Sequence, residues 1–270
     1  MRSVVRILIS LFVLAGLAGS VSAQGPGERR GRLDRLGLSS DQGAKIKQLL
    51  KSNRTDGEAA KRALRADRMR LFAMYDEYRL NEAATRDCIN RVNHGQLALL
   101  KSSLERELGL RGILTQDQFA QLHRMMGPQR GPERFGEGPG RGRGSDGPRP
   151  GLEFQSRRLP QLQLTNGQQR AVERLWQAQD KDSEGAIRDM GRDLRAIQTS
   201  YGAYRLDERA ARRLIVTINR SQMRLMQARL EAQIGLRKIL SEDQFRTLTE
   251  HVQRTFKAPN NAKRQARSKR

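Results

Sequence analysis

The fold is decided by a stretch that the chain contains twice. Residues 109–119 read GLRGILTQDQF, and residues 235–245 read GLRKILSEDQF, 126 positions later. Extended outward without a gap, the match covers residues 33–122 against 159–248, with about 32 of 90 positions identical. Two copies of so long a unit indicate a tandem domain duplication, because solenoid repeats are shorter and more numerous.

Each copy of this stretch contains a helix-start signal, Leu-[Ser/Thr]-x-x-Gln, and the same signal opens each unit. In such a capping box the hydroxyl accepts a hydrogen bond from the amide of the Gln, and the Gln side chain bonds the amide of the cap residue. The later leucine of each unit is also predicted to pack on a phenylalanine five positions on. The four motifs comprise Leu38, Ser39 and Gln42; Leu114, Thr115 and Gln118; Leu164, Thr165 and Gln168; and Leu240, Ser241 and Gln244.

The composition of both units favours helices. All eight prolines lie outside 33–126 and 161–257, and these stretches are rich in Leu, Arg, Ala, Gln and Glu. No segment shows the alternation of apolar and polar residues that is typical of a β-strand next to a hairpin turn. The predicted fold class is all-α, with two tandem four-helix units. In the first unit we expect helices near 40–53, 57–78, 82–109 and 116–126, and Asn81 and Asp207 as N-caps of the third helices.

Apolar residues at helical spacing mark the expected core. In the second unit one seam is formed by Ile187, Met190, Leu194, Ile197, Tyr201 and Tyr204. The third helices carry equivalent seams, formed by Ile89, Val92, Leu99, Leu100, Leu104 and Leu108, and by Ile215, Ile218, Leu225, Met226, Leu230 and Ile234.

The first residues are typical of a secretory signal peptide. Arg2 and Arg6 form a positively charged segment before an apolar run, 7–17, that is short for a bilayer span, and Val21-Ser22-Ala23 is a small-residue cleavage site. We therefore expect a signal peptide over 1–23, cleaved near Ala23, and an exported protein, which the resemblance described below places in the periplasm. An uncleaved membrane anchor is the alternative.

The rest of the chain divides by composition. The expected order is a disordered stretch at 24–32, unit one at 33–126, a linker at 127–158, unit two at 159–252 and a disordered basic tail at 253–270. The linker holds nine Gly and five Pro, and such a composition builds no core.

Net charge and residue counts restrict the classes of partner and activity that the protein can have. The chain has 52 Lys and Arg against 29 Asp and Glu, a net charge of +23, and the tail is strongly basic. Such a charge favours an acidic partner: nucleic acid, an anionic membrane or polymer, or acidic protein segments. Export argues against nucleic acid and against ATP as an energy source. Since no catalytic motif is present, we expect no enzyme activity and no cofactor.

A metal site and a redox site are not expected either. A single cysteine excludes an internal disulfide framework and a cysteine-based metal site. The histidines His94, His123 and His251 offer no pair at metal-binding spacing, so no metal is predicted. Cys88 is predicted to be a small core residue, with a reactive or intermolecularly bonded thiol as the alternative.

Together these features resemble the Spy/CpxP family of periplasmic proteins, also called the LTxxQ-motif family. The resemblance rests on export, all-helical units of about 90 residues and the paired Leu-[Ser/Thr]-x-x-Gln motifs, and it covers 33–126 and 159–252. It implies a four-helix, hairpin-like protomer, two of which pair antiparallel into a thin, curved cradle. It also implies an ATP-independent chaperone for unfolded periplasmic proteins or an inhibitor of envelope-stress sensor kinases, and a related branch binds metals. This chain carries both units on one polypeptide, so the resemblance implies that they pair as an elongated pseudo-dimer.

A basic and apolar stripe is the predicted client-binding surface. Basic groups speed the encounter with an acidic client, and flexible apolar groups between them accept many sequences. The alternative is an ordinary solvated helix face. The stripe comprises Arg62, Arg65, Met69 and Phe72 in unit one, and Arg209, Arg213, Val216, Arg220 and Met223 in unit two.

The predicted function is therefore that of a periplasmic chaperone, or holdase, whose partners are unfolded or misfolded envelope proteins. The alternative is an envelope-stress or metal-responsive regulator that docks a membrane sensor kinase. A binder of anionic polymers through the basic tail is a third possibility. No nucleic-acid partner is expected.

Overall fold

The structure, a computed structural model, describes residues 36–126 and 162–250. Within these ranges 88% of residues are helical and none forms a strand, so the all-α prediction is confirmed. The predicted signal peptide, the 24–32 stretch, the linker and the basic tail lie outside the described residues. None of the described helices is both long enough and apolar enough to cross a membrane.

Each unit contributes two long helices and a short one. In unit one these are α4 (Ser40–Asp76), α5 (Glu82–Ile113) and α6 (Gln116–Met126). In unit two they are α8 (Asn166–Gly202), α9 (Glu208–Ile239) and a helix at 242–250. Asn81 and Asp207 cap α5 and α9, each accepting from the amide three residues on.

The predicted break between helices at 40–53 and 57–78 is wrong, because α4 runs through it without interruption. Two polar side chains in the presumed break bond back to the preceding turn: Asn53 Nδ2 donates to Leu49 O at 2.8 Å, and Thr55 Oγ1 donates to Lys51 O at 3.1 Å. Gly57 alone costs about 1 kcal/mol relative to alanine, too little to end a long packed helix. Each unit therefore has three helices in the described residues.

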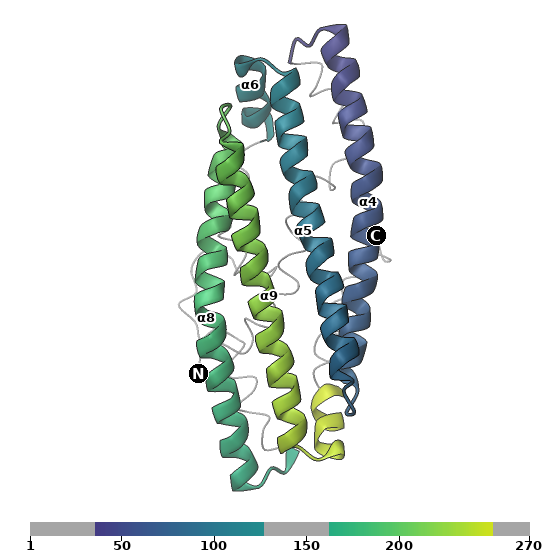
Figure 1. The fold of residues 1–270 in the computed structure, drawn as a ribbon, viewed down its shortest axis with the longest axis vertical. Helices are drawn as coiled ribbons and strands as arrows, with labels where there is room; N and C mark the ends of the chain where they lie inside the picture. Colours follow the sequence, from purple (N-terminus) through teal and green to yellow (C-terminus); the bar gives the residue numbers. More distant parts are fainter. Residues whose placement is uncertain (1–35, 127–161, 251–270) are drawn as a thin grey trace, which may run out of the picture.

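The four long helices lie side by side in the order α8, α9, α5, α4 (Figure 1). α4 and α5 form one hairpin, α8 and α9 form the other, and the two hairpins contact each other along α5 and α9. The short helices lie at opposite ends of the molecule, each beside the turn of the other unit's hairpin: α6 near the α8–α9 turn and the 242–250 helix near the α4–α5 turn (Figure 1).

The core is shared between the two units. The expected seam on α8 is buried from Met190 to Tyr201, and Leu104 of α5 joins the same cluster. In the reverse sense, Met226 and Leu230 of α9 pack with the core of the α4–α5 hairpin. Because each hairpin buries apolar residues of the other, neither forms its core alone.

Candidate functional site

On α4 the predicted client-binding residues are partly available to solvent. Arg62, Arg65 and Met69 are exposed, and Met69 has 63% of its surface accessible. Phe72 is half-buried, because the guanidinium of Arg229 lies 5.3 Å from the centre of its ring. The α4 part of the stripe is therefore an exposed methionine beside two arginines, with the phenylalanine partly covered from α9.

On α9 the predicted residues divide in the same way. Arg209, Arg213, Val216 and Arg220 are exposed, and Val216 has 49% of its surface accessible. Met223 is half-buried against the core of the α4–α5 hairpin.

The structure does not join the two parts of the stripe into one continuous surface. The α4 part meets α9 on the side that carries Arg229, through Phe72. Arg220 lies nine residues before Arg229, which is two and a half helical turns, so it points to the opposite side of α9. The single stripe is thus two separate patches: the α4 patch, Arg62, Arg65 and Met69, and the α9 patch, Arg209, Arg213, Val216 and Arg220.

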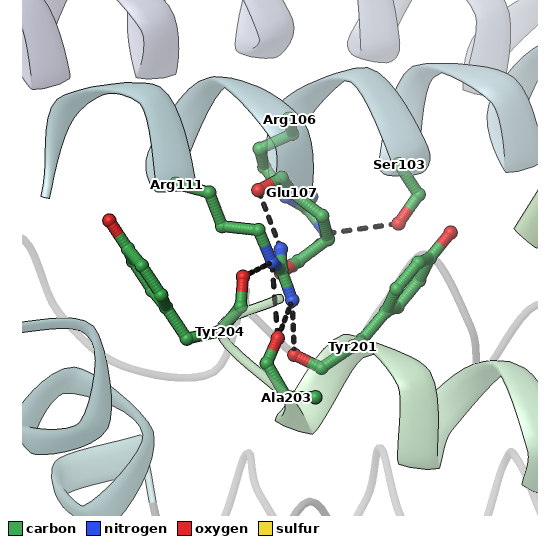
Figure 2. Close-up of polar contacts among 7 residues, drawn as sticks. All are labelled: Ser103, Arg106, Glu107, Arg111, Tyr201, Ala203 and Tyr204. Atoms are coloured by element: carbon green, nitrogen blue, oxygen red, sulfur yellow. Dashed lines mark hydrogen bonds and ion pairs between the residues drawn. The ribbon is translucent and has the colours of Figure 1, made fainter. Parts of the chain in front are cut away.

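A buried arginine joins the end of α5 to the turn of the other hairpin, a contact that we call latch one (Figure 2). Arg111 donates from Nη2 to Tyr201 O at 2.7 Å and Ala203 O at 2.8 Å, and from Nε to Tyr204 O at 3.1 Å. Its Nη1 donates to Glu107 Oε2 at 3.1 Å. Carbonyls at a helix C-terminus lack partners within the helix, so this one side chain caps α8 from the other unit.

Latch two is the equivalent contact at the other end of the molecule. Arg237 of α9 donates from Nη2 to Tyr75 O at 2.9 Å and Glu77 O at 2.6 Å, and from Nε to Tyr78 O at 3.0 Å. Its Nη1 donates to Gln233 Oε1 at 3.0 Å. The two latches thus cap α8 and α4 with the same backbone geometry.

A tyrosine and a phenylalanine complete each latch. The hydroxyl of Tyr204 donates to Leu114 O at 3.0 Å, and its ring packs edge-on against Phe119, 5.7 Å between centres. At latch two, Tyr78 donates to Leu240 O at 3.2 Å and packs against Phe245 in the same way. The prediction that Tyr204 belongs to the core seam of unit two is therefore wrong. Tyr204 lies past the end of α8 and packs on unit one.

The four capping motifs form capping boxes, and the two motifs of each unit are also joined by a hydrogen bond between their glutamines. Gln42 Nε2 donates to Gln118 Oε1 at 2.9 Å and to Ile113 O at 2.9 Å. Gln168 makes the same bonds to Gln244 Oε1 and Ile239 O, both at 2.9 Å. The glutamine of each motif thus closes its own cap and joins the start of the unit's first helix to that of its last.

Sequence reasoning assigned no role to Arg111 and Arg237. The available signal was that two blocks repeat at the 126-residue shift, residues 109–114 with 235–240 and residues 78–82 (YRLNE) with 204–208 (YRLDE), and these blocks supply both sides of each latch. The block at 109–114 provides the arginine of latch one, and the block at 204–208 begins with the tyrosine that it contacts. Arg237 stands among apolar residues and has no acidic residue three or four positions away, so its charge needs partners from elsewhere in the fold.

The two latches differ in buried charge. At latch one, Arg111 is paired with Glu107, whose side chain is 6% exposed, and Arg106 lies 3.9 Å from the same carboxylate. At latch two, the corresponding partner of Arg237 is the neutral Gln233. A further arginine, Arg229, occupies the position that corresponds to a serine in unit one.

The cysteine and histidines occupy ordinary structural environments. Cys88 is fully buried, its thiol donates to Asp67 O at 3.3 Å, and burial raises its pKa. His94 is exposed and its Nδ1 contacts Asn90 O at 2.8 Å. His123 packs on the ring of Phe119, and burial lowers its pKa. His251 lies outside the described residues, which contain no group of His, Cys, Asp and Glu suited to a metal ion.

No protein-family model, no curated protein and no solved structure matches this chain.

Proposed function

We propose that this protein is an ATP-independent chaperone of the cell envelope, a single-chain form of the paired Spy/CpxP-like cradle. The observation that carries the proposal is the exposure of large apolar side chains among exposed arginines: Met69 beside Arg62 and Arg65, and Val216 beside Arg213 and Arg220. Apolar groups grouped with charges on a helical surface suit a partner that offers both acidic and apolar segments.

The chemistry of these patches fits transient binding of unfolded chains. Exposed arginines raise the rate of encounter with acidic segments through long-range attraction. The methionine side chain is flexible and polarisable, so it accepts apolar groups of different shape. A client that folds buries its own apolar groups and thereby loses its contacts with the surface, so release requires no nucleotide.

The inter-unit contacts support this function by making the surface rigid. The latches tie each hairpin turn to the other unit, and Arg86 and Arg212 add cross-unit ion pairs to Glu231 and Glu105 at 3.0 and 2.9 Å. A surface fixed in this way loses little conformational entropy on binding. The proposed location, the periplasm, rests on the signal-peptide pattern at 1–23, which predicts export, and on the resemblance to the Spy/CpxP family.

An aggregation assay with two unrelated unfolded proteins tests the proposal. The full mature chain is expected to suppress light scattering by both clients without ATP. Met69→Ser combined with Val216→Ser should weaken this protection several-fold, and added salt should slow capture while leaving apolar binding in part. Leu50→Ser is the matched control, because Leu50 is another exposed apolar residue of α4, 42% accessible, outside both patches.

Three outcomes would contradict the proposal. Equal loss of protection in the Leu50→Ser variant would remove the special role of the patches. Full protection by the patch variant, together with none after deletion of residues 257–270, would indicate a binder of anionic surfaces through the basic tail. Absence of protection for both clients would favour the regulator that docks a sensor kinase.

A further inference from the structure

One side of α4 exposes a row of basic and apolar residues, which we call the α4 strip. Its members recur at helical spacing, which places them on one side of the helix, and α4 lies at the edge of the row of helices (Figure 1). From position 47 to position 69 the strip extends over about 33 Å, at ~1.5 Å per residue. Its exposed members are Lys47, Leu50, Lys51, Arg54, Arg62, Arg65 and Met69.

The five cations of the strip have no counter-charge of their own. Within residues 36–126 and 162–250, none of them forms an ion pair with a carboxylate. The acidic residue on the same side of α4, Glu58, is bound instead by Lys61 at 3.1 Å. Cations one turn apart on a helix repel each other, so an anionic partner on this side of α4 would be stabilised by all five.

Two large apolar side chains stand among these cations. Leu50 is 42% exposed and Met69 63%, and only one other large apolar side chain of the described residues, Val216 of α9, is as open to solvent. Leu50 lies three residues after Lys47 and four before Arg54, so it projects between them. Apolar groups among cations suit a surface with anionic headgroups above acyl chains. A soluble polyanion would use the charges alone.

The equivalent stretch of unit two does not share this character. Residues 45–70 contain nine Lys and Arg against three Asp and Glu, whereas residues 171–196 contain five against six. Glu173 and Asp180 stand at the positions of Lys47 and Arg54. Both α4 and α8 nevertheless have 37 residues and begin with a capping box. The fold therefore does not require the basic charge of the strip, which points to a role in binding.

We propose that the α4 strip docks the protein on the surface of an anionic lipid bilayer, with α4 parallel to the plane of the bilayer. Each Lys or Arg near such a surface is attracted by the lipid headgroups, and Leu50 and Met69 enter the interfacial region. Docking does not depend on chaperone activity. The bilayer and an unfolded client would compete for the α4 patch, whereas the α9 patch lies on the other hairpin and outside the strip.

Co-sedimentation of the full mature chain with lipid vesicles tests the docking surface. The vesicles are phosphatidylcholine alone, or phosphatidylcholine with about one third phosphatidylglycerol. The protein should sediment with the anionic vesicles and not with the neutral ones, and added salt should weaken the binding. No sedimentation with the anionic vesicles overturns the proposal. Binding to the soluble polyanion heparin without binding to vesicles would also overturn it and assign the strip to a soluble polymer.

A variant that copies unit two tests whether the strip is the surface used. The triple variant gives the start of the strip the residues of α8, and it should bind anionic vesicles about tenfold or more weakly. All three positions are exposed and outside the client patches, so urea unfolding and client protection should stay unchanged. This separates a failure of docking from a failure of the chaperone function. The changes are Lys47→Glu, Lys51→Gln and Arg54→Asp.

The matched control makes the same change in net charge on α8, at exposed cations of unit two. This control should keep nearly the full binding to anionic vesicles. Equal losses in the two triple variants would show that overall charge alone attracts the lipid, and the strip would be overturned. Unchanged binding in the α4 variant, with loss after deletion of residues 257–270, would assign the contact to the basic tail and overturn it as well. The control changes are Arg170→Glu, Arg174→Asp and Lys181→Gln.

Discussion

The two latches have the same backbone contacts and different buried charge. Arg111 and Arg237 donate to equivalent carbonyls of the opposite hairpin at 2.6–3.2 Å, and each lies over a phenylalanine ring at 4.4 and 4.3 Å. Yet the carboxylate of Glu107 neutralises the charge of Arg111, whereas the amide of Gln233 accepts a hydrogen bond from Arg237 without neutralising its charge. The repeated blocks therefore determine the geometry of the contact, while the charge balance around it varies independently.

Loss of the latch arginines should show this difference most strongly. Arg111→Ala removes the closer partner of the buried Glu107 and leaves it only Arg106, 3.9 Å away, so it should cost about 3–5 kcal/mol of unfolding free energy. Arg237→Ala leaves a neutral amide and freed carbonyls, so about 1–3 kcal/mol is expected. Urea unfolding of both variants at pH 7 measures the two losses. Equal losses would mean that the Glu107 charge contributes nothing to latch one.

Alkaline pH should destabilise the fold at both latches through Tyr75 and Tyr201, the buried tyrosines whose carbonyls accept from the latch arginines. Burial is the main cause that raises the pKa of Tyr75 and of Tyr201 to about 12, and the charge of Glu107 adds to it at Tyr201 while Arg229 opposes it at Tyr75. An unfolded tyrosine ionises near pH 10. The unfolded state is therefore favoured as pH rises from about 10 to 12, and each tyrosine costs at most about 2–3 kcal/mol over that window.

Phenylalanine substitutions measure this contribution at each latch. Tyr75→Phe and Tyr201→Phe should each flatten the fall in unfolding free energy above pH 10, as followed by urea unfolding at pH 7, 9, 10 and 11. At pH 7 Tyr75→Phe should be neutral or stabilising, since its hydroxyl has no partner among the described residues. A drop above pH 10 that persists in the double variant would assign the alkaline loss to other groups.

The sequence predicts local structure here better than contacts between the units. Capping chemistry is read from four adjacent residues, and it places the starts of α4 and α8 at the expected positions. The continuity of α4 depends instead on side chains that bond back within the helix, such as Asn53, and on packing against α5. A short polar stretch with one glycine gives no information on that packing.

The candidate site shows the same limit. Helical spacing groups Arg62, Arg65 and Met69 correctly on one side of α4, but it cannot tell which side of α9 faces them. That relation depends on how the hairpins pack, and it separates Val216 and Arg220 from the α4 patch. The latch arginines were hidden for a similar reason, because their acceptors are carbonyls about 90 and 160 residues away.

The capping hydroxyls should contribute equally at the two ends of the molecule. Thr115 accepts from the amide of Gln118 at 3.3 Å, and Ser241 accepts from that of Gln244 at 3.3 Å. Thr115→Ala and Ser241→Ala should therefore each cost about 1 kcal/mol, as measured by urea unfolding. A variant without any effect would show that the glutamine pair holds that helix start without the hydroxyl.

The smallest expected difference lies at the residue that precedes the first motif of each unit. Gly37 has φ +58°, and the equivalent Gln163 has φ +48°. Both carbonyls accept from a motif glutamine, Gly37 O from Gln118 at 3.3 Å and Gln163 O from Gln244 at 3.4 Å. The left-handed conformation costs a residue with a Cβ about 1–2 kcal/mol, whereas glycine adopts it freely.

Exchanging these residues tests whether the conformation is needed at both ends. Gln163→Gly should stabilise unit two by about 0.5–1 kcal/mol, because the relief of strain exceeds the entropy that glycine loses on folding. Gly37→Gln should destabilise unit one by a similar amount, and the double exchange should return the unfolding free energy close to that of the parent. Urea unfolding of the three variants provides the measurement. Destabilisation by Gln163→Gly would mean that the Gln163 side chain contributes more to unit two than its backbone conformation costs, and the two ends would then differ in more than their buried charge.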